Sequence, residues 1–303
     1  MTDFADFGRI FTAMVTPMRE DGSVDMGQAT ALATGLLENG SDGLVVCGTT
    51  GEASTLEFEE ERTLFRELLP ICHAQGGALV AGTGSNSTRT AIDSSRRAEE
   101  IGVDGLLLVV PYYNKPSQEG MYRHFRAIAE SVTRPCILYN VPSRTGISMN
   151  AATQLRLARD VSNINGTKEA SGDLDLIATI VDAAPEGFRV WSGNDGDTLP
   201  ILALGGYGVI SVVSHLAGRQ LRSMVEAFLA GRRDEAAAIH RRLGPLTNSL
   251  FLEGNPVPVK YALNQAGFRV GPTRLPLVEP SAPVRAAIDA ELERAQIDLP
   301  ARV

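Results

Sequence analysis

The stretch Gly105-Leu106-Leu107-Leu108-Val109-Val110 is apolar throughout, and Pro111 ends it. A short apolar run bounded by a turn residue predicts a strand that is buried on both faces. Seven comparable runs recur along the chain with helical patterns between them, near Arg9–Val15, Gly43–Cys47, Ala78–Gly82, Cys136–Tyr139, Ile164–Lys168, Phe188–Ser192 and Gly208–Val212. Eight strand–helix units at roughly thirty-residue spacing predict an α/β fold, a closed (β/α)8 TIM barrel rather than an open doubly wound sheet.

The strand pattern stops after the eighth run. The remaining segments are predicted to be helices separated by Gly and Pro, near Arg233–Leu252, Val257–Gln265 and Pro283–Ala295. We therefore expect a catalytic barrel over residues 1–230 and a small helical domain over residues 231–303.

Composition and charge indicate which kinds of binding partner and which cellular location to expect. The 36 acidic and 28 basic side chains give a net charge of -8 without a Lys/Arg-dense run, so we expect no nucleic acid partner. The first residues, Met1–Asp6, carry acids where a signal peptide carries basic residues, which favours a cytoplasmic protein. The most apolar stretch, Ile201–Ala217, is interrupted by glycines and fits a barrel strand with flanking helices better than a membrane span.

Cysteines and histidines give no sign of a disulfide framework or a metal site. Cys47, Cys72 and Cys136 are widely spaced and form no CxxC pair, so we expect reduced, mostly buried thiols. The four histidines show neither HExxH spacing nor clustering with carboxylates. We expect neither a metal nor an organic cofactor.

Lys168 is the main candidate for chemistry. Side chains alternate along a strand, so Ile164, Gly166 and Lys168 are predicted to face the lumen, with Gly166 leaving room for the lysine stem. Lys168 would then lie at the carboxyl end of the sixth strand, where barrel enzymes build their active sites. A desolvated lysine amine is a nucleophile, but an ion pair with Glu169 or another rim carboxylate is the alternative.

Two neighbouring segments carry hydroxyl groups. Tyr139 ends the fifth strand, where its phenol could move protons beside Lys168, or could simply cap a loop. The loop Gly48-Thr49-Thr50-Gly51-Glu52 follows the second strand, and its hydroxyl and backbone N–H groups suit a small carboxylate. An ordinary strand-to-helix turn is the alternative for that loop.

Four motifs in this order resemble the dihydrodipicolinate synthase family of class I pyruvate aldolases, in the N-acetylneuraminate lyase superfamily. They are Gly48–Glu52, Pro111-Tyr112-Tyr113-Asn114-Lys115-Pro116, Tyr139-Asn140-Val141-Pro142-Ser143-Arg144-Thr145-Gly146 and Lys168-Glu169-Ala170-Ser171-Gly172-Asp173. Gly208–Val212 and Asn255-Pro256-Val257-Pro258-Val259-Lys260 agree as well, so the resemblance covers nearly the whole chain.

The resemblance implies a lyase of lysine and diaminopimelate biosynthesis that condenses pyruvate with L-aspartate-4-semialdehyde to 4-hydroxy-tetrahydrodipicolinate. Lys168 would form the Schiff base with pyruvate. Thr50, Thr49 and backbone groups near Gly193 or Ile210 would hold the pyruvate carboxylate and carbonyl region.

The same resemblance assigns the remaining roles. Thr49, Tyr139 and Tyr113 would form a proton relay, with Tyr113 reaching into the neighbouring subunit's site, which would make a dimer the minimum catalytic unit. The resemblance also implies a homotetramer built from tight dimers. Arg144 would receive the semialdehyde carboxylate, a task that its forked donors suit, although a surface ion pair is the alternative.

Some positions depart from the lysine-inhibited members of the family. Their interface pocket corresponds here to Asn86, Tyr112, Glu61, Phe58 and Thr90. Phe58 removes a polar group and Thr90 a carboxylate, so we expect weak or absent feedback by lysine.

Three other functions compete. An N-acetylneuraminate lyase or another pyruvate aldolase would share Lys168 and Tyr139, but such lyases generally lack the Ser143–Gly146 run. A catalytically silent barrel could bind a keto acid or a partner protein. A phosphate-handling barrel would want a glycine-rich loop after the last strands, and Trp191–Asp195 and Val212–His215 offer little of it.

Overall fold

The computed structural model describes residues 7–299, and these form a closed barrel of parallel strands in sequence order. Each strand pairs with its neighbours in the chain, and β8 closes on β1 with Ile210 beside Phe11. The strands are β1 (Ile10–Ala13), β2 (Gly43–Val46), β3 (Ala78–Gly82), β4 (Gly105–Val109), β5 (Cys136–Asn140), β6 (Ile164–Glu169), β7 (Arg189–Ser192) and β8 (Gly208–Ser211). The predicted TIM barrel is therefore confirmed.

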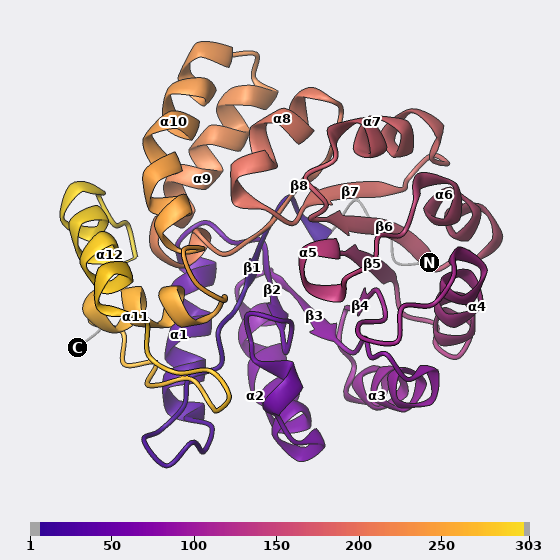
Figure 1. Cartoon of the computed structure of the whole chain (residues 1–303), viewed down its shortest axis with the longest axis horizontal. Coiled ribbons are helices and arrows are strands. Elements are labelled where there is room, and N and C mark those ends of the chain that lie inside the picture. Colours follow the sequence, from indigo (N-terminus) through magenta and orange to yellow (C-terminus); the bar gives the residue numbers. More distant parts are fainter. Residues whose placement is uncertain (1–6, 300–303) are drawn as a thin grey trace.

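Helices surround the barrel and follow its strands in turn (Figure 1). They are α1 (Met26–Glu38), α2 (Phe58–Ala74), α3 (Thr88–Ile101), α4 (Gln118–Ala129), α6 (Ala151–Asp160), α7 (Leu174–Ala183), α8 (Thr198–Ala203) and α9 (Ser214–Leu229). Three short helices lie in loops at the carboxyl ends of the strands: η2 (Ala53–Thr55), α5 (Pro142–Thr145) and η3 (Asp195–Asp197). No helix among residues 7–299 combines the length and apolarity needed to cross a membrane.

The predicted C-terminal helices are confirmed as α10 (Arg233–Ser249), α11 (Val257–Gln265) and α12 (Ala282–Arg294), on one side of the barrel (Figure 1). α10 packs along α9, and α12 packs against α10 and α11. The domain boundary between residues 230 and 231 stays a prediction, since α10 continues the packing of the barrel helices without a gap.

The apolar core has an inner and an outer layer. Inside the barrel, Phe11, Ile137, Trp191 and Ile210 belong to a lumen cluster that also includes Tyr139. A larger cluster lies between the strands and the helices, and it contains Cys47, Cys72 and Cys136. All three cysteines are buried and free, as the sequence predicts.

The sixth strand departs from simple alternation. The register with β5 shifts between Cys136 and Ile137, so that Ile164 opposes Cys136 while Gly166 opposes Ile137. This bulge leaves Ile164 in the outer cluster, so the prediction that Ile164 faces the lumen is wrong. Lys168, beyond the bulge, keeps its lumen position opposite Tyr139.

Gly166 has a different role from the predicted one. A Cβ at this position would lie 2.6 Å from Cζ3 of Trp191. The glycine therefore makes room for the indole of the next strand rather than for the lysine stem. Trp191 is completely buried and belongs to the lumen cluster.

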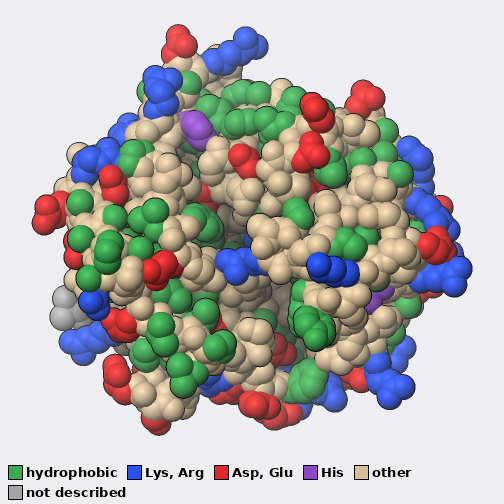
Figure 2. Space-filling model, in the orientation of Figure 1, with side chains coloured by type: hydrophobic (Ala, Val, Ile, Leu, Met, Phe, Trp, Pro, Cys, Tyr) green, Lys and Arg blue, Asp and Glu red, His purple; other side chains and the backbone are tan. Residues whose placement is uncertain are grey.

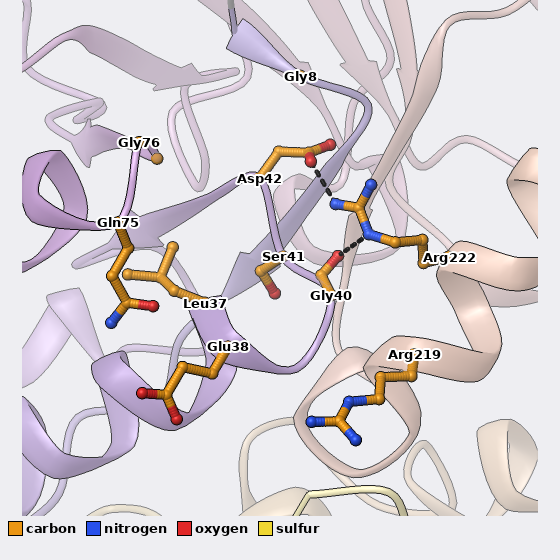
Figure 3. A pocket seen from close by; sticks show the side chains of 11 residues that line it. Gly8, Leu37, Glu38, Gly40, Ser41, Asp42, Gln75, Gly76, Arg219 and Arg222 are labelled. Atoms are coloured by element: carbon orange, nitrogen blue, oxygen red, sulfur yellow. Dashed lines mark hydrogen bonds and ion pairs between the residues drawn. The ribbon is translucent and has the colours of Figure 1, made fainter.

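A polar cavity of about 480 Å³ lies at the amino ends of β1–β3 (Figure 3). There Asp42 accepts hydrogen bonds from the backbone of Arg9 and Ile10, and it also pairs with Arg222. Arg222 additionally donates from Nε to the carbonyl of Gly40 at 3.1 Å. Because these contacts join the first and second strands to α9 at the amino ends of the strands, the end where barrel residues typically serve stability, we assign them a structural role.

Candidate active site

A cavity of about 570 Å³ opens at the carboxyl ends of β2–β5. Its lining brings together Thr49 after β2, Tyr139 on β5 and Arg144 on α5. α5 lies over the barrel mouth in Figure 1, and Figure 2 shows that face hollowed near its centre. Three residues from separate segments of the sequence thus face one space.

Lys168 lies beside this cavity on β6. Its side chain is buried, and its Nζ lies 4.4 Å from the centroid of the Tyr139 ring. The two residues are register partners on adjacent strands. The hydroxyl of Tyr139 makes no hydrogen bond to another residue in the described range, and neither does that of Thr49. Both hydroxyls are therefore available to a substrate.

The alternative of an ion pair between Lys168 and Glu169 is wrong. Glu169 points to the outer side of the barrel, where its carboxylate accepts hydrogen bonds from Asn140, Gln154 and Ser171. Burial raises the pKa of Glu169 to about 7 against the effect of these donors. Within residues 7–299, the Lys168 amine forms no ion pair.

Gly193, directly after β7, borders the lysine, while Ile210 lies on β8. A Cβ on Gly193 would lie 3.1 Å from Cγ of Lys168 and 2.7 Å from Cβ of Ala170, so only glycine leaves the lysine stem its place. The Gly193 N–H already donates to the carbonyl of Glu169 at 2.6 Å. The Gly193 group that remains for a ligand is thus its carbonyl. Ile210 is buried in the lumen cluster.

The loop with the two threonines is tied down from several sides. Thr50 is buried, and its Oγ1 accepts a hydrogen bond of 2.8 Å from Nδ2 of Asn255. The hydroxyl of Thr16 donates to the carbonyl of Gly51 at 2.6 Å. The hydrogen in the bond to Asn255 belongs to the Asn255 amide. The single hydrogen of the Thr50 hydroxyl therefore remains free to donate to a ligand.

Arg144 reaches the same C-terminal segment. Its Nη2 donates to the carbonyl of Asn255 at 3.2 Å, which leaves most of the guanidinium donors unused. Asn255 thus touches both Thr50 and Arg144, and its own buried Oδ1 has no partner among the described residues. The alternative of a surface ion pair for Arg144 is not seen: it pairs with no carboxylate of residues 7–299.

Tyr113 lies apart from the other predicted site residues. Its side chain is 90% exposed, and its backbone has a left-handed φ of 72°. Two hydrogen bonds join Asn86 to the loop: the Asn114 side chain donates to the Asn86 carbonyl at 2.9 Å, and the Asn86 side chain donates to the Tyr112 carbonyl at 3.2 Å. The loop is thus held in place while the side chain of its tyrosine is exposed.

The outer part of the cavity contains four of the five positions that correspond by sequence resemblance to the interface pocket of lysine-inhibited family members. Phe58, Glu61, Thr90 and Tyr112 all line it. The guanidinium of Arg97 lies 4.8 Å from the Phe58 ring centroid. Burial, together with the charge of Glu60, raises the pKa of Glu61 to about 7.

Sequence reasoning missed a buried carboxylate near the lysine. Asp195, in η3, accepts hydrogen bonds from the backbone N–H groups of Val212 and Val213 at 2.9 and 3.0 Å. Burial raises its pKa, while the charge of Lys168 works in the opposite direction. Its acidic side chain in the loop after β7 was the only signal in the sequence.

Comparison with known proteins agrees with this geometry. Residues 6–295 match the model of the Dihydrodipicolinate synthetase family. The chain is 55% identical over 295 residues to the 4-hydroxy-tetrahydrodipicolinate synthase of Dehalococcoides mccartyi strain 195, with 97% of this chain and 99% of the relative covered.

Solved structures give the same result. The dihydrodipicolinate synthase of Cyanidioschyzon merolae with lysine bound has a TM-score of 0.94 and 46% identity, covering 95% of this chain and 98% of that one. The chloride-inhibited enzyme of Acinetobacter baumannii complexed with pyruvate has a TM-score of 0.92 and 39% identity, covering 96% and 99%.

Proposed function

The chain belongs to the dihydrodipicolinate synthetase family, and we propose that it uses Lys168 to condense pyruvate with L-aspartate-4-semialdehyde. The product is 4-hydroxy-tetrahydrodipicolinate, in the biosynthesis of diaminopimelate and lysine. The observation that carries this proposal is the buried Lys168 amine against the Tyr139 ring, at the end of the barrel where Thr49 and Arg144 face one cavity.

The chemistry follows from a neutral amine at a keto carbon. The Lys168 nitrogen adds to C2 of pyruvate, the carbinolamine loses water, and the resulting iminium loses a methyl proton to become an enamine. The enamine carbon attacks the semialdehyde carbonyl. The amine of the semialdehyde then displaces Lys168 by transimination, which closes the ring and frees the enzyme.

Each of these steps moves a proton beside the lysine. We assign this work to Tyr139 and Thr49, whose hydroxyls are not engaged elsewhere in residues 7–299, with Tyr113 of a second subunit completing the relay. Thr50 and Thr49 hold the pyruvate carboxylate. The carbonyl of Gly193 and the backbone of Ile210 border the reacting carbon.

Arg144 selects the acceptor in this proposal. A guanidinium at the cavity wall binds the carboxylate of a short amino-acid semialdehyde in a forked geometry. A long polyhydroxylated sugar acid would need hydroxyl partners instead. N-acetylneuraminate lyase is therefore the less favoured function, and the relatives at 55% identity carry the synthase name.

We extend the proposal to assembly and regulation. The exposed Tyr113 supports a tight dimer, two of which would form a homotetramer. We propose a cytoplasmic enzyme, and we propose weak or absent feedback by lysine because Phe58 and Thr90 replace polar and acidic groups in the outer cavity.

Borohydride trapping tests the proposed mechanism. Reduction in the presence of pyruvate should yield a stable adduct on the peptide that contains Lys168, identified by mass spectrometry, and Lys168→Ala should yield none. An active wild-type enzyme without an adduct would overturn the Schiff-base mechanism. Parallel assays with aspartate semialdehyde and N-acetylneuraminate separate the two aldolase functions.

A further inference from the structure

A buried ion pair fastens the threonine loop to the C-terminal segment. Glu52, the last residue of the loop, lies with Oε1 2.8 Å from Nζ of Lys260 on α11. The two side chains are 1% and 2% exposed, and the residues are 208 positions apart in the sequence. The pair therefore joins the strand-two loop to a helix that comes after the whole barrel.

Lys260 has no donor left for a substrate. Besides Glu52, its ammonium donates to the carbonyls of Thr16 at 2.9 Å and Pro272 at 2.6 Å. An ammonium has three hydrogens, so all of them are used. Lys260 also does not line the active-site cavity. It is thus not a second Schiff-base lysine.

Glu52 is held in an unusual backbone conformation. Its φ is 59°, in the left-handed region that non-glycine residues seldom adopt, and its second carboxylate oxygen accepts from the backbone N–H of Arg274 at 2.9 Å. The Arg274 guanidinium in turn binds Glu60 on α2 and the carbonyl of Thr55. The C-terminal segment thus holds the short turn from Glu52 to Thr55 at both of its ends, through Lys260 and Arg274 at Glu52 and through Arg274 at Thr55.

The desolvation cost of a buried pair makes it a poor source of stability, because apolar side chains of similar volume often serve as well. Such a pair can instead hold the two segments that it joins in a fixed relative position. We propose that Glu52 and Lys260 are positioning residues that hold Thr49 and Thr50 where they bind the pyruvate carboxylate. This inference rests on the proposed function.

Asn255 gives the same loop a second, uncharged attachment. Its hydrogen bond to Thr50 Oγ1 orients that hydroxyl, and its residue precedes α11, which carries Lys260. The side chains of Asn255 and Lys260 thus act on neighbouring residues of one loop. Asn255→Ala removes the hydrogen bond without leaving a charge buried.

The test is Lys260→Met, which keeps the length of the side chain and removes its three donors. We expect kcat/KM for pyruvate to fall about 10²-fold, mainly through a higher KM, because small displacements of binding groups have effects of this size. The KM for semialdehyde should change much less. Hydrogen exchange at the amides of Glu52, Ala53 and Thr55, which are bonded within the loop, should speed up.

A matched control separates positioning from stability. Asp42→Asn breaks the partly buried pair with Arg222 at the other end of the barrel, and it should lower the unfolding midpoint without changing the KM for pyruvate. The double variant Glu52→Gln/Lys260→Met should regain stability over Lys260→Met but keep the high KM, since the bonds to Thr16 and Pro272 stay lost.

Two outcomes would overturn the proposal: an unchanged KM for pyruvate in a folded Lys260→Met, or an equal rise in Asp42→Asn at a matched loss of stability. If Lys260→Met does not fold, the double variant Glu52→Gln/Lys260→Met decides, because it leaves no unpaired charge buried and should raise the same KM. Failure of the function itself is distinguishable, since it would appear as a missing borohydride adduct in the wild-type enzyme.

Discussion

The Lys168 amine faces the Tyr139 ring at 4.4 Å from its centroid, across the pairing of β6 with β5. The ring fixes the place of the amine, and the hydroxyl has no partner among residues 7–299. Packing and the proposed proton transfer would therefore use different parts of one side chain. Substitutions can remove them one at a time.

Tyr139→Phe keeps the ring and removes the hydroxyl. We expect kcat to fall about 10²- to 10³-fold, as for the loss of a general acid–base group, with little change in the unfolding midpoint. The rate of borohydride trapping with pyruvate should fall in parallel. Tyr139→Leu is the comparison, since it loses the ring as well and should also lower stability. Full activity in Tyr139→Phe would remove the tyrosine from the proposed relay.

Arg144→Met tests the choice of acceptor. The KM for aspartate semialdehyde should rise about 10- to 10²-fold, because a forked charge-assisted contact to its carboxylate is lost. Pyruvate adduct formation should stay within about two-fold of wild type, since that step precedes acceptor binding. Arg144→Lys, which keeps the charge and loses the fork, should recover little. An equal loss of both steps would place Arg144 in pyruvate binding instead.

The barrel could be predicted because the pattern of an apolar strand followed by a helix occurs eight times in the sequence. An error in the bounds of one strand does not change the number of strands. The face of Ile164 could not be predicted, since a bulge shifts the alternation by one residue and forms only when β6 pairs with β5. The role of Gly166 depends on Trp191 of the next strand, a contact that exists only after the strands pair.

The proposed exchange of Tyr113 between subunits predicts complementation. Tyr113→Phe and Lys168→Ala should each be nearly inactive alone. In a mixed dimer, the site with an intact Lys168 receives an intact Tyr113 from its partner, so mixing should restore about a quarter of wild-type activity if subunits exchange at random. Native mass spectrometry would establish that exchange. Exchange without any recovered activity would contradict a shared site.

Glu169 predicts a pH dependence of stability. Burial raises its pKa from 4.5 to about 7, so the folded state binds the proton more tightly than the unfolded state does. The resulting stabilisation is complete below pH 4.5 and is lost as pH rises through 7, at most about 3 kcal/mol. Glu169→Gln should lack this loss. The difference in free energy of unfolding between the variant and the wild type should therefore shift in favour of the variant as pH rises from 4.5 through 7. Urea unfolding at several pH values measures both free energies, and parallel plots against pH for the variant and the wild type would refute the prediction.

The positions of Thr49, Tyr139 and Arg144 were predictable since each lies at the carboxyl end of a strand or in the segment that follows it, at the same end of the barrel. The attachments of their loops were not. Asn255 and Lys260 lie in the helical segment more than two hundred residues from Thr50 and Glu52, and nothing in the sequence pairs them before the fold is known. Asp195 was hidden for a similar reason, because its partners Val212 and Val213 lie on the next strand's loop.

The outer cavity predicts weak inhibition by L-lysine. Arg97 lies over the Phe58 ring and repels a second cation, and Glu61, with a pKa of about 7, is only partly charged at neutral pH. Titration of the wild type with lysine should therefore leave most of the activity. Thr90→Glu adds the carboxylate that the resemblance to lysine-inhibited members implies at this position. The variant should fold well because position 90 is the third residue of α3, capped by Ser87, where glutamate completes a capping box. Lysine should inhibit this variant more strongly, and Thr90→Gln, which adds the same bulk without charge, should not change the response. Strong inhibition of the wild type would instead show that neither Phe58 nor Thr90 prevents lysine from binding.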